Sequence, residues 1–230
     1  MAERPVTAPE FVHVLTLQVD STWRRLPPAQ REEDLDAFRR VFQRTTGDVR
    51  TLTYSMVGLR PDADLLLMRF AASLDALETS ASLLLRSGVG RSMRVAHSWI
   101  GLIRQSQYTK RPPTGQEQGL RTGDRAAYLV VYPFTKTHEW YQLSRETRQG
   151  MMSEHIRIGH DYPQVRQLLA HSTGLDDQEF IVAYETDDLT VFQDLVVALR
   201  ETEARRFTLR DTPTLTAISR SLEDALALLG

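Results

Sequence analysis

His155 is the side chain of this sequence whose setting best suits a metal ligand. Spacings of three and four residues place Met151, Met152 and His155 on one face of a predicted helix. Ser144 is a suitable N-cap for this helix, and His155 is expected to close it. An imidazole on such a face either binds a transition-metal ion or makes a hydrogen bond within the core, and the spacing alone leaves both roles open.

Residues that can complete a pocket lie on both sides of this helix. Trp140 and Tyr141 precede it and can supply aromatic walls. A segment around residues 161–171, which we interpret as helical, follows it and offers Arg166 and Gln167 as polar side chains. The pattern predicts a mixed aromatic and polar cavity near the imidazole.

Tyr132 follows an apolar strand and precedes Pro133, which takes the chain out of regular pairing. Its phenol is therefore expected either in a pocket at the strand end or at an interface. Lys136 and His138 lie just beyond and either pair with carboxylates of an acidic ligand or stay solvated.

Other metal and catalytic sites are poorly supported. The sequence has no cysteine, which excludes disulfides, iron–sulfur clusters and thioether-linked haem. His155, His160 and His171 lack the spacing of a three-histidine metal site, and His171 is expected to be structural, beside a helix stop at Gly174. No phosphate-binding glycine loop, GxSxG elbow or HExxH motif is present.

The composition is that of a globular protein of one large or two small cores. The chain has 230 residues, 41% apolar and 25% charged, with a formal net charge of −2. No basic patch for nucleic acid or a membrane surface is apparent, so a small-molecule or protein partner is expected. The start lacks a signal-peptide core and no apolar run approaches the roughly 18 residues that span a bilayer, which predicts a cytoplasmic protein.

The elements that position these residues belong to an internal repeat. A shift of 115 residues aligns residues 11–17 with 126–132 and residues 64–70 with 179–185, all strand-like. The segments that follow carry matching apolar stripes at the same offset: Leu74, Leu77, Ala81 and Leu84 against Leu189, Phe192, Val196 and Leu199.

The repeat predicts an α+β fold of two tandem ferredoxin-like units, each an antiparallel sheet with helices on one face. The N-terminal unit spans residues 1–109 and carries no cofactor, residues 110–123 are a linker rich in Pro and Gly, and the C-terminal unit spans residues 124–230 and carries the candidate site. The expected elements are 11–20, 28–45, 51–58, 64–70, 73–87 and 93–106, then 126–134, 143–155, 159–171, 178–185, 189–203 and 206–219.

The order of the parts resembles the superfamily of chlorite dismutases and coproheme decarboxylases, which are haem-binding dimeric α+β barrels. The likeness rests on Tyr132-Pro with Lys136 four residues after the tyrosine, on Trp-Tyr before Met152-x-x-His, on the turn Ser172-Thr-Gly-Leu-Asp-Asp and on Ala63-Asp-Leu-Leu-Leu. It covers most of the chain from about residue 50.

The resemblance implies an iron porphyrin, either coprohaem or haem b, held by His155 as the metal ligand. It implies that Glu203 accepts a hydrogen bond from the other imidazole nitrogen and that Lys136 holds a propionate. Gln167 is implied at the distal position, where chlorite dismutases carry an arginine; a different gap puts Arg166 there. Contacts to the porphyrin are expected from Lys136, Trp140, Tyr141, Met152 and Arg166.

The implied reaction is peroxide-dependent decarboxylation of two propionates of iron coproporphyrin to vinyl groups, with Tyr132 as the radical-bearing residue. The runner-up is chlorite dismutation to chloride and dioxygen, which the turn and the C-terminal region favour. A protein that binds or senses haem without turnover is a third possibility, and a purely structural subunit that binds no haem is a fourth. Such relatives are usually rings of five, so a homo-oligomer, most simply a pentamer, is expected.

Overall fold

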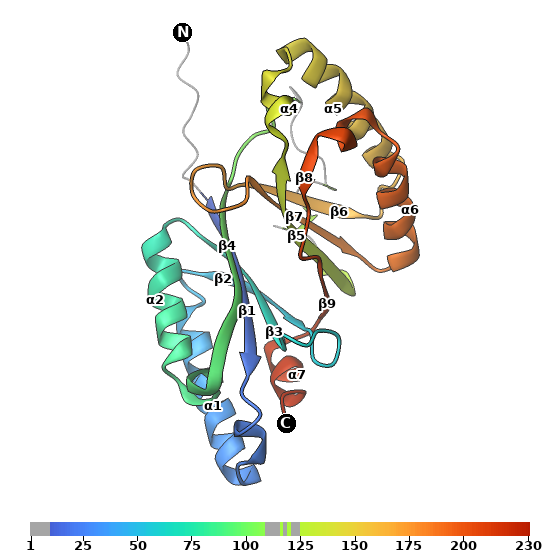
Figure 1. Cartoon of the computed structure of the whole chain (residues 1–230). Coiled ribbons are helices and arrows are strands. Elements are labelled where there is room, and N and C mark those ends of the chain that lie inside the picture. Colours follow the sequence, from blue (N-terminus) through green and yellow to red (C-terminus); the bar gives the residue numbers. More distant parts are fainter. Residues whose placement is uncertain (1–9, 109–115, 117–118, 121–124) are drawn as a thin grey trace. The chain divides into compact units, whose positions relative to one another are not determined.

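The chain divides into two compact units in the computed structural model, which describes residues 10–108, 116, 119–120 and 125–230 (Figure 1). The first unit comprises Met1–Ile103 and Arg220–Gly230, and the second comprises Arg104–Ser219. The sequence-based boundaries put residues 220–230 in the second unit, whereas this segment packs with the first. The predicted linker, residues 110–123, lies mostly outside the described residues.

The first unit is a four-stranded antiparallel sheet in the order β4-β1-β3-β2, with α1 and α2 packed against each other on one face (Figure 1). Its elements are β1 (Glu10–Val19), α1 (Pro28–Thr45), β2 (Arg50–Ser55), β3 (Leu65–Ala71), α2 (Leu74–Leu85), β4 (Met93–Ile103) and α7 (Leu222–Ala227). Proline at the first position of α1 is favourable because its missing N–H would have no partner there.

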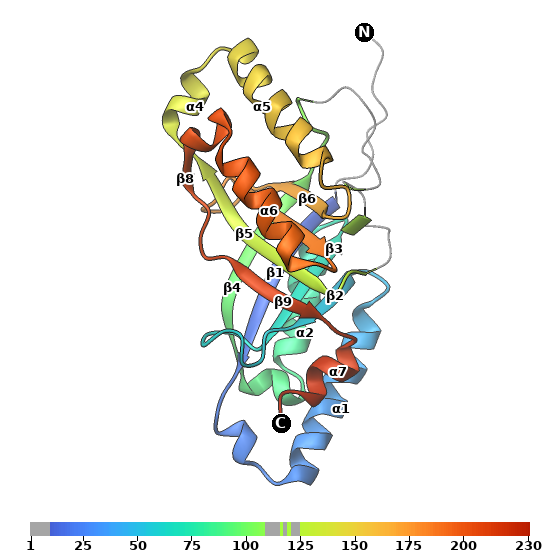
Figure 2. The same cartoon turned by 90° about the vertical axis from the view of Figure 1, so that its right-hand side faces the viewer.

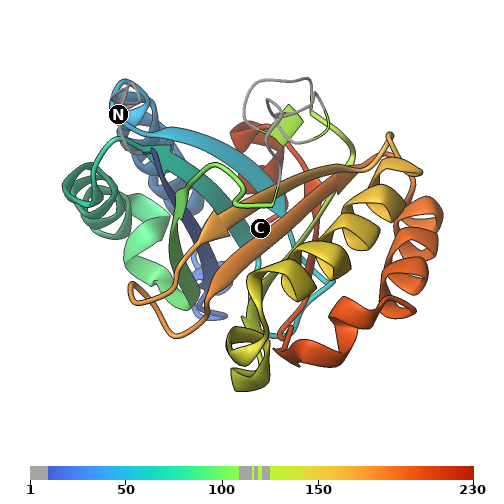
Figure 3. The same cartoon turned by 90° about the horizontal axis from the view of Figure 1, so that it is seen from above.

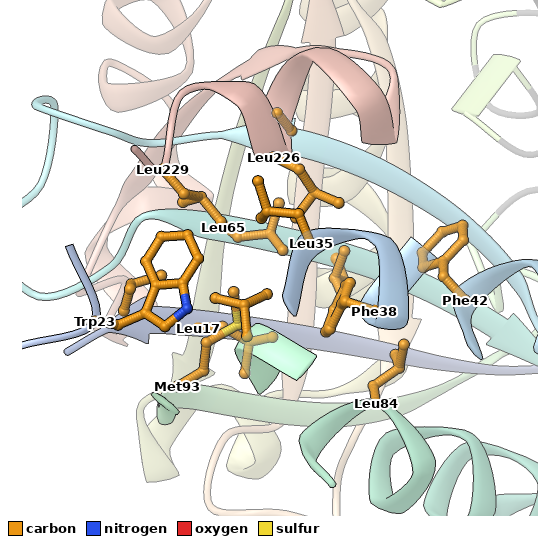
Figure 4. Packing of buried hydrophobic residues seen from close by; sticks show 14 of the residues in the cluster. Leu17, Trp23, Leu35, Phe38, Phe42, Leu65, Leu84, Met93, Leu226 and Leu229 are labelled. Atoms are coloured by element: carbon orange, nitrogen blue, oxygen red, sulfur yellow. The ribbon is translucent and has the colours of Figure 1, made fainter. Parts of the chain in front are cut away.

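The helix-facing side of this sheet is filled by large apolar side chains. Leu17 and Leu65 from the strands pack with Leu35, Phe38 and Phe42 from α1, as Figure 4 shows. The three α1 residues recur at three- and four-residue steps, which gives the helix one buried stripe. Leu226 of α7 and Leu229, which follows that helix, close the same cluster, which explains why the C-terminal segment belongs to this unit.

The second unit repeats this layout. Its sheet has the order β6-β7-β5-β9, also antiparallel, and α5 and α6 lie side by side on one face (Figures 2 and 3). Its elements are β5 (Tyr128–Lys136), α4 (His138–Gln142), α5 (Arg145–His160), β6 (Arg166–His171), β7 (Phe180–Thr186), α6 (Leu189–Arg200), the 3-10 helix η3 (Glu203–Phe207), β8 (Thr208–Arg210) and β9 (Leu215–Ser219).

The structure confirms the fold class predicted from the repeat. The strands β3 and β7 and the helices α2 and α6 begin and end at the same offset of 115 residues. The repeat diverges at its last strand, because the continuous β4 corresponds to the two short strands β8 and β9. The break between them lies opposite Pro133, since β5 pairs through Val131 with β9 and through Thr135 with β8.

Three local predictions were wrong. Residues 161–171 are not helical, because Arg166–His171 form the strand β6, paired along its length with β7. Helix α5 does not close at His155 but continues to His160. Tyr132 does not end its strand, because β5 runs on to Lys136. Ser144 is the N-cap of α5 as predicted, and its side chain accepts a hydrogen bond from the Thr147 N–H.

None of the helices in the described part of the chain is both long and apolar enough to cross a bilayer.

Candidate functional site

Helix α5 has 16 residues, and none of them is buried. The corresponding helix of the first unit, α1, buries Leu35, Phe38 and Phe42. Apolar side chains are nevertheless present on α5, and Met152 and Ile156 beside His155 are half-buried. The helix therefore lies over its sheet without completing a core, and its apolar side chains remain accessible to a ligand.

This contrast predicts different costs for truncating the two helices. Phe38→Ala removes a fully buried ring and is expected to lower the free energy of unfolding by about 3–5 kcal/mol. Met152→Ala is expected to cost under about 1 kcal/mol in the protein without ligand, because this side chain is only half-buried. Denaturant unfolding of the ligand-free variants measures both values, and equal losses would show that α5 closes a core of its own.

Strand register brings Tyr132, Gln167 and Tyr184 to one face of the second sheet. Gln167 lies directly opposite Tyr184, and Tyr132 lies opposite Val182, two residues before Tyr184. Opposed residues share a face and side chains alternate along a strand, so all of these point the same way. Tyr132 and Tyr184 pack in one apolar cluster with Leu195 of α6, which identifies this face as the one covered by the helices.

Arg166 occupies the opposite face. It lies across from Glu185, a fully buried carboxylate that Arg125 contacts at 2.8 Å from Nε to Oε1. The sequence left Gln167 and Arg166 as alternatives for the position facing the imidazole. Strand alternation places Gln167 on the helix side and turns Arg166 away from it, so the predicted contact between Arg166 and a porphyrin is not supported.

Lys136 lies near enough to His155 for its charge to act on the imidazole. Its Nζ donates to the Ala204 carbonyl at 3.1 Å and lies 4.3 Å from the ring centroid of Trp140. Burial, and then the charge of Arg205, lower the pKa of Lys136 to about 8, against an opposing effect of Glu179. Lys136 thus contacts the η3 backbone and an indole ring, and its contact with a propionate stays a prediction.

Trp140 and Tyr141, the expected aromatic walls, differ in exposure. Trp140 is 3% exposed and packs on Phe207, with ring centroids 5.7 Å apart. Tyr141 is 43% exposed, and burial of its phenol together with Glu179 raises its pKa. Trp140 thus packs against Lys136, and Tyr141 remains exposed.

His155 is a half-buried side chain in a neutral state. Burial, and then the positive charge of Lys136, lower its pKa to about 4. No hydrogen bond from the described residues reaches its imidazole. The predicted acceptor Glu203 is exposed and lies 3.3 Å from Arg206, so it does not orient this ring. A neutral imidazole with a free nitrogen is the form that binds a metal ion.

Replacing Lys136 tests the electrostatic coupling to His155. Lys136→Met is expected to raise the pKa of His155 above about 4, whereas Lys136→Arg keeps the charge and should keep the pKa low. NMR titration of histidine-labelled protein without ligand measures both. A pKa of His155 that is unchanged in Lys136→Met would contradict the coupling.

The same lowered pKa predicts the sign of a stability effect. Between about pH 4 and the ordinary histidine pKa of 6.5, the unfolded chain binds the proton that folded His155 excludes. The contribution of neutral His155 is therefore complete above about pH 6.5 and is lost as the pH falls toward 4.

Tyr132 keeps its proton at neutral pH. Burial raises its pKa well above the usual value, the neighbouring Tyr184 and Asp211 raise it further, and Arg205 opposes them. Arg205 and Asp211 form an ion pair with each other. At neutral pH Tyr132 is therefore a protonated phenol, which can donate a hydrogen atom or a proton.

The remaining histidines do not build a metal site. His138 is exposed, and His171 lies against Phe180 with ring centroids 5.3 Å apart. Within the described ranges, no group of three or more His, Asp or Glu side chains is placed to hold a metal ion. A three-histidine site formed by His155, His160 and His171 is thus not supported.

Two features of the site were missed in the sequence. Tyr184 follows Val182 at the two-residue spacing of a strand face, so its position next to Tyr132 was available from the pattern once the pairing partner was known. The ion pair of Arg205 and Asp211 had no sequence signal, because it depends on how η3 and the segment after β8 fold back beside β5.

Comparisons with known proteins identify relatives of this chain. A family model described as chlorite dismutase matches residues 31–220. The chain is 34% identical over 177 residues to the coproheme decarboxylase of Mycolicibacterium smegmatis, covering 76% of this chain and 75% of that protein. It is 32% identical over 165 residues to a protein of Halobacterium salinarum named as heme-binding, covering 64% of this chain and 33% of that longer protein.

Solved structures give the same result over nearly the whole chain. The crystal structure of a mutant chlorite dismutase from Candidatus Nitrospira defluvii superimposes with a TM-score of 0.88 at 28% identity, covering 96% of this chain and 95% of that one. The match of the family model, the relative at 34% identity and the shared fold lead to one conclusion. The chain belongs to the chlorite dismutase family.

Proposed function

We propose that this protein is a coproheme decarboxylase that converts iron coproporphyrin to haem b with hydrogen peroxide. The observation that carries the proposal is that Tyr132 and the uncharged Gln167 share the sheet face covered by the helix that bears His155. The relative at 34% identity bears the name of this activity. In each of two steps a propionate loses carbon dioxide, a hydrogen atom and one electron to become a vinyl group. One hydrogen peroxide takes up the hydrogen atom, the electron and one proton from solvent and gives two waters.

The residues of the site fit an iron porphyrin. Helix α5 offers half-buried apolar side chains, including Met152, and a neutral imidazole from His155, which is a common ligand of such an iron. When bound, the iron supplies the chemistry that takes two oxidising equivalents from peroxide. The protein's own contribution is to hold the porphyrin and to place a reactive propionate next to Tyr132.

Tyr132 and Gln167 have distinct roles in this proposal. Tyr132, protonated at rest, gives up a hydrogen atom and then takes one from the carbon chain of the propionate, so that the phenol is restored in each step. Gln167 offers an amide that donates and accepts hydrogen bonds without adding charge at the site. Burial, and then the positive charge of Lys136, favour the neutral imidazole of His155 by lowering its pKa.

Chlorite dismutation is the second candidate, favoured by the family model and by the likeness to a chlorite dismutase structure. The family resemblance implies that chlorite dismutases use an arginine at the position facing the imidazole. We assign that position to Gln167, because Arg166 lies on the other face of the strand. Oxygen release from chlorite, measured with an oxygen electrode, tests this candidate, and loss of carboxyl groups from iron coproporphyrin tests the first.

Variants of the two adjacent residues on β6 test which of them faces the site. Gln167→Ala is expected to lower the rate of decarboxylation by about tenfold or less, because a single neutral hydrogen-bonding group is lost. Arg166→Gln is expected to lower thermal stability, since Arg166 lies opposite the buried Glu185, and to leave the rate of the folded protein unchanged. The reverse order of effects on the rate would place Arg166 at the site.

A further inference from the structure

Tyr184 is a buried phenol next to Tyr132. Its side chain is 5% exposed, and its ring centroid lies 6.3 Å from that of Tyr132 and 5.3 Å from that of Phe192. In the strand ladder it lies directly opposite Gln167. Tyr184 is therefore flanked by both residues to which the proposed reaction assigns a part.

The fold does not demand a tyrosine at this position. The repeat offset of 115 residues places Arg69 of β3 at the equivalent point of the first unit, also on the helix-facing side and fully buried. There the guanidinium donates to the Leu77 carbonyl at 2.9 Å and contacts His13. The same position of the repeat is thus occupied by a guanidinium in the first unit and by a phenol in the unit with the candidate site.

Resting on the proposed function, we propose that Tyr184 is a redox partner of Tyr132 and shares its oxidising equivalent. The Tyr132 phenoxyl formed with peroxide as oxidant takes a hydrogen atom from Tyr184: the O–H bond of Tyr184 breaks and that of Tyr132 forms. Tyr132 is reduced by one electron and Tyr184 is oxidised by one. The reverse transfer returns the oxidising equivalent to Tyr132 when a propionate is in place.

The surroundings of the two rings explain what this exchange achieves. Tyr132 is half-buried and lies near the charged Arg205 and Asp211. Tyr184 packs among Val165, Leu195 and Phe192, away from solvent reductants. Burial raises the pKa of both phenols, so each holds the proton that moves with the electron. Transfer to Tyr184 therefore protects an oxidising equivalent that no substrate has yet consumed.

The pairing itself is tested without any porphyrin. In protein labelled with carbon-13 at the tyrosine ring carbon that bears oxygen, Tyr184→Phe is expected to shift the pKa of Tyr132 downward, because Tyr184 helps to raise it. Tyr162→Phe is the matched control, since Tyr162 packs on the same cluster, and should leave the titration of Tyr132 unchanged. A Tyr132 pKa unaffected by Tyr184→Phe would overturn the pairing.

The redox role is tested by freeze-quench electron paramagnetic resonance after peroxide is added to protein loaded with ferric coproporphyrin. The wild type should show two tyrosyl signals. Tyr184→Phe should lose one of them, and the other should decay several-fold faster, whereas Tyr132→Phe should lose both. Identical signals and decay in the wild type and Tyr184→Phe would overturn the role of Tyr184.

The proposed function fails separately, if the wild-type protein removes no carboxyl group from the porphyrin. That result would also rule out the redox role of Tyr184. The pKa titration of Tyr132 would still show whether the two phenols interact.

Discussion

Tyr132→Phe is expected to abolish peroxide-dependent decarboxylation while leaving porphyrin uptake intact. The substitution removes one oxygen atom and keeps the ring that packs against the α6 cluster, so the fold and the binding surface are preserved. The phenol is the group that exchanges a hydrogen atom with the propionate, and phenylalanine has no equivalent bond to give. We expect a loss of at least about a hundredfold in rate, which corresponds to about 2.7 kcal/mol of barrier.

Mass analysis of the porphyrin after peroxide addition measures this loss, and a porphyrin titration of the same variant checks uptake. Tyr128→Phe is the matched control, because Tyr128 lies on the same strand and, four residues earlier, on the same face. Full turnover by Tyr132→Phe would remove Tyr132 from the mechanism. Equal losses in both variants would point to a general effect on the strand.

His155→Ala is expected to weaken binding of the iron porphyrin by about 10- to 100-fold, or about 1.4–2.7 kcal/mol. The substitution removes the neutral imidazole that the structure offers on the accessible face of α5, and it leaves the remaining apolar contacts in place. Absorbance titration with ferric coproporphyrin measures the affinity and also reports a change of iron ligand.

Added imidazole supplies the missing ligand and should restore the absorbance spectrum of His155→Ala. His160→Ala is the matched control on the last turn of the same helix. Its affinity should stay close to that of the wild type. Unchanged affinity and an unchanged spectrum in His155→Ala would show that the iron is held elsewhere.

The repeat allowed much of the fold to be predicted. The apolar stripes of α2 and α6 and the strands before them recur at a fixed offset, and local periodicity determines such elements. Strand β6 was missed because Gln167, Leu168 and Ala170 favour a helix in isolation. These residues form a strand because they pair with β7, and a pattern of neighbouring residues does not contain that pairing.

The candidate site was predictable only where one element determines it. The N-cap at Ser144 and the helix of His155 follow from local sequence. The choice between Gln167 and Arg166 required the strand assignment, because a strand sends adjacent side chains to opposite faces. The position of Lys136 depends on a contact with η3, and that of Glu203 depends on how η3 itself folds; no short-range pattern contains that information.

The central claim is that this protein removes carboxyl groups from a porphyrin that it binds through His155. The direct measurement is to mix purified protein with ferric coproporphyrin, add hydrogen peroxide in small portions and follow the mass of the porphyrin. Stepwise loss of two carboxyl groups, ending at haem b, is the predicted result. Binding of the porphyrin with no change in its mass at any peroxide dose would contradict the claim.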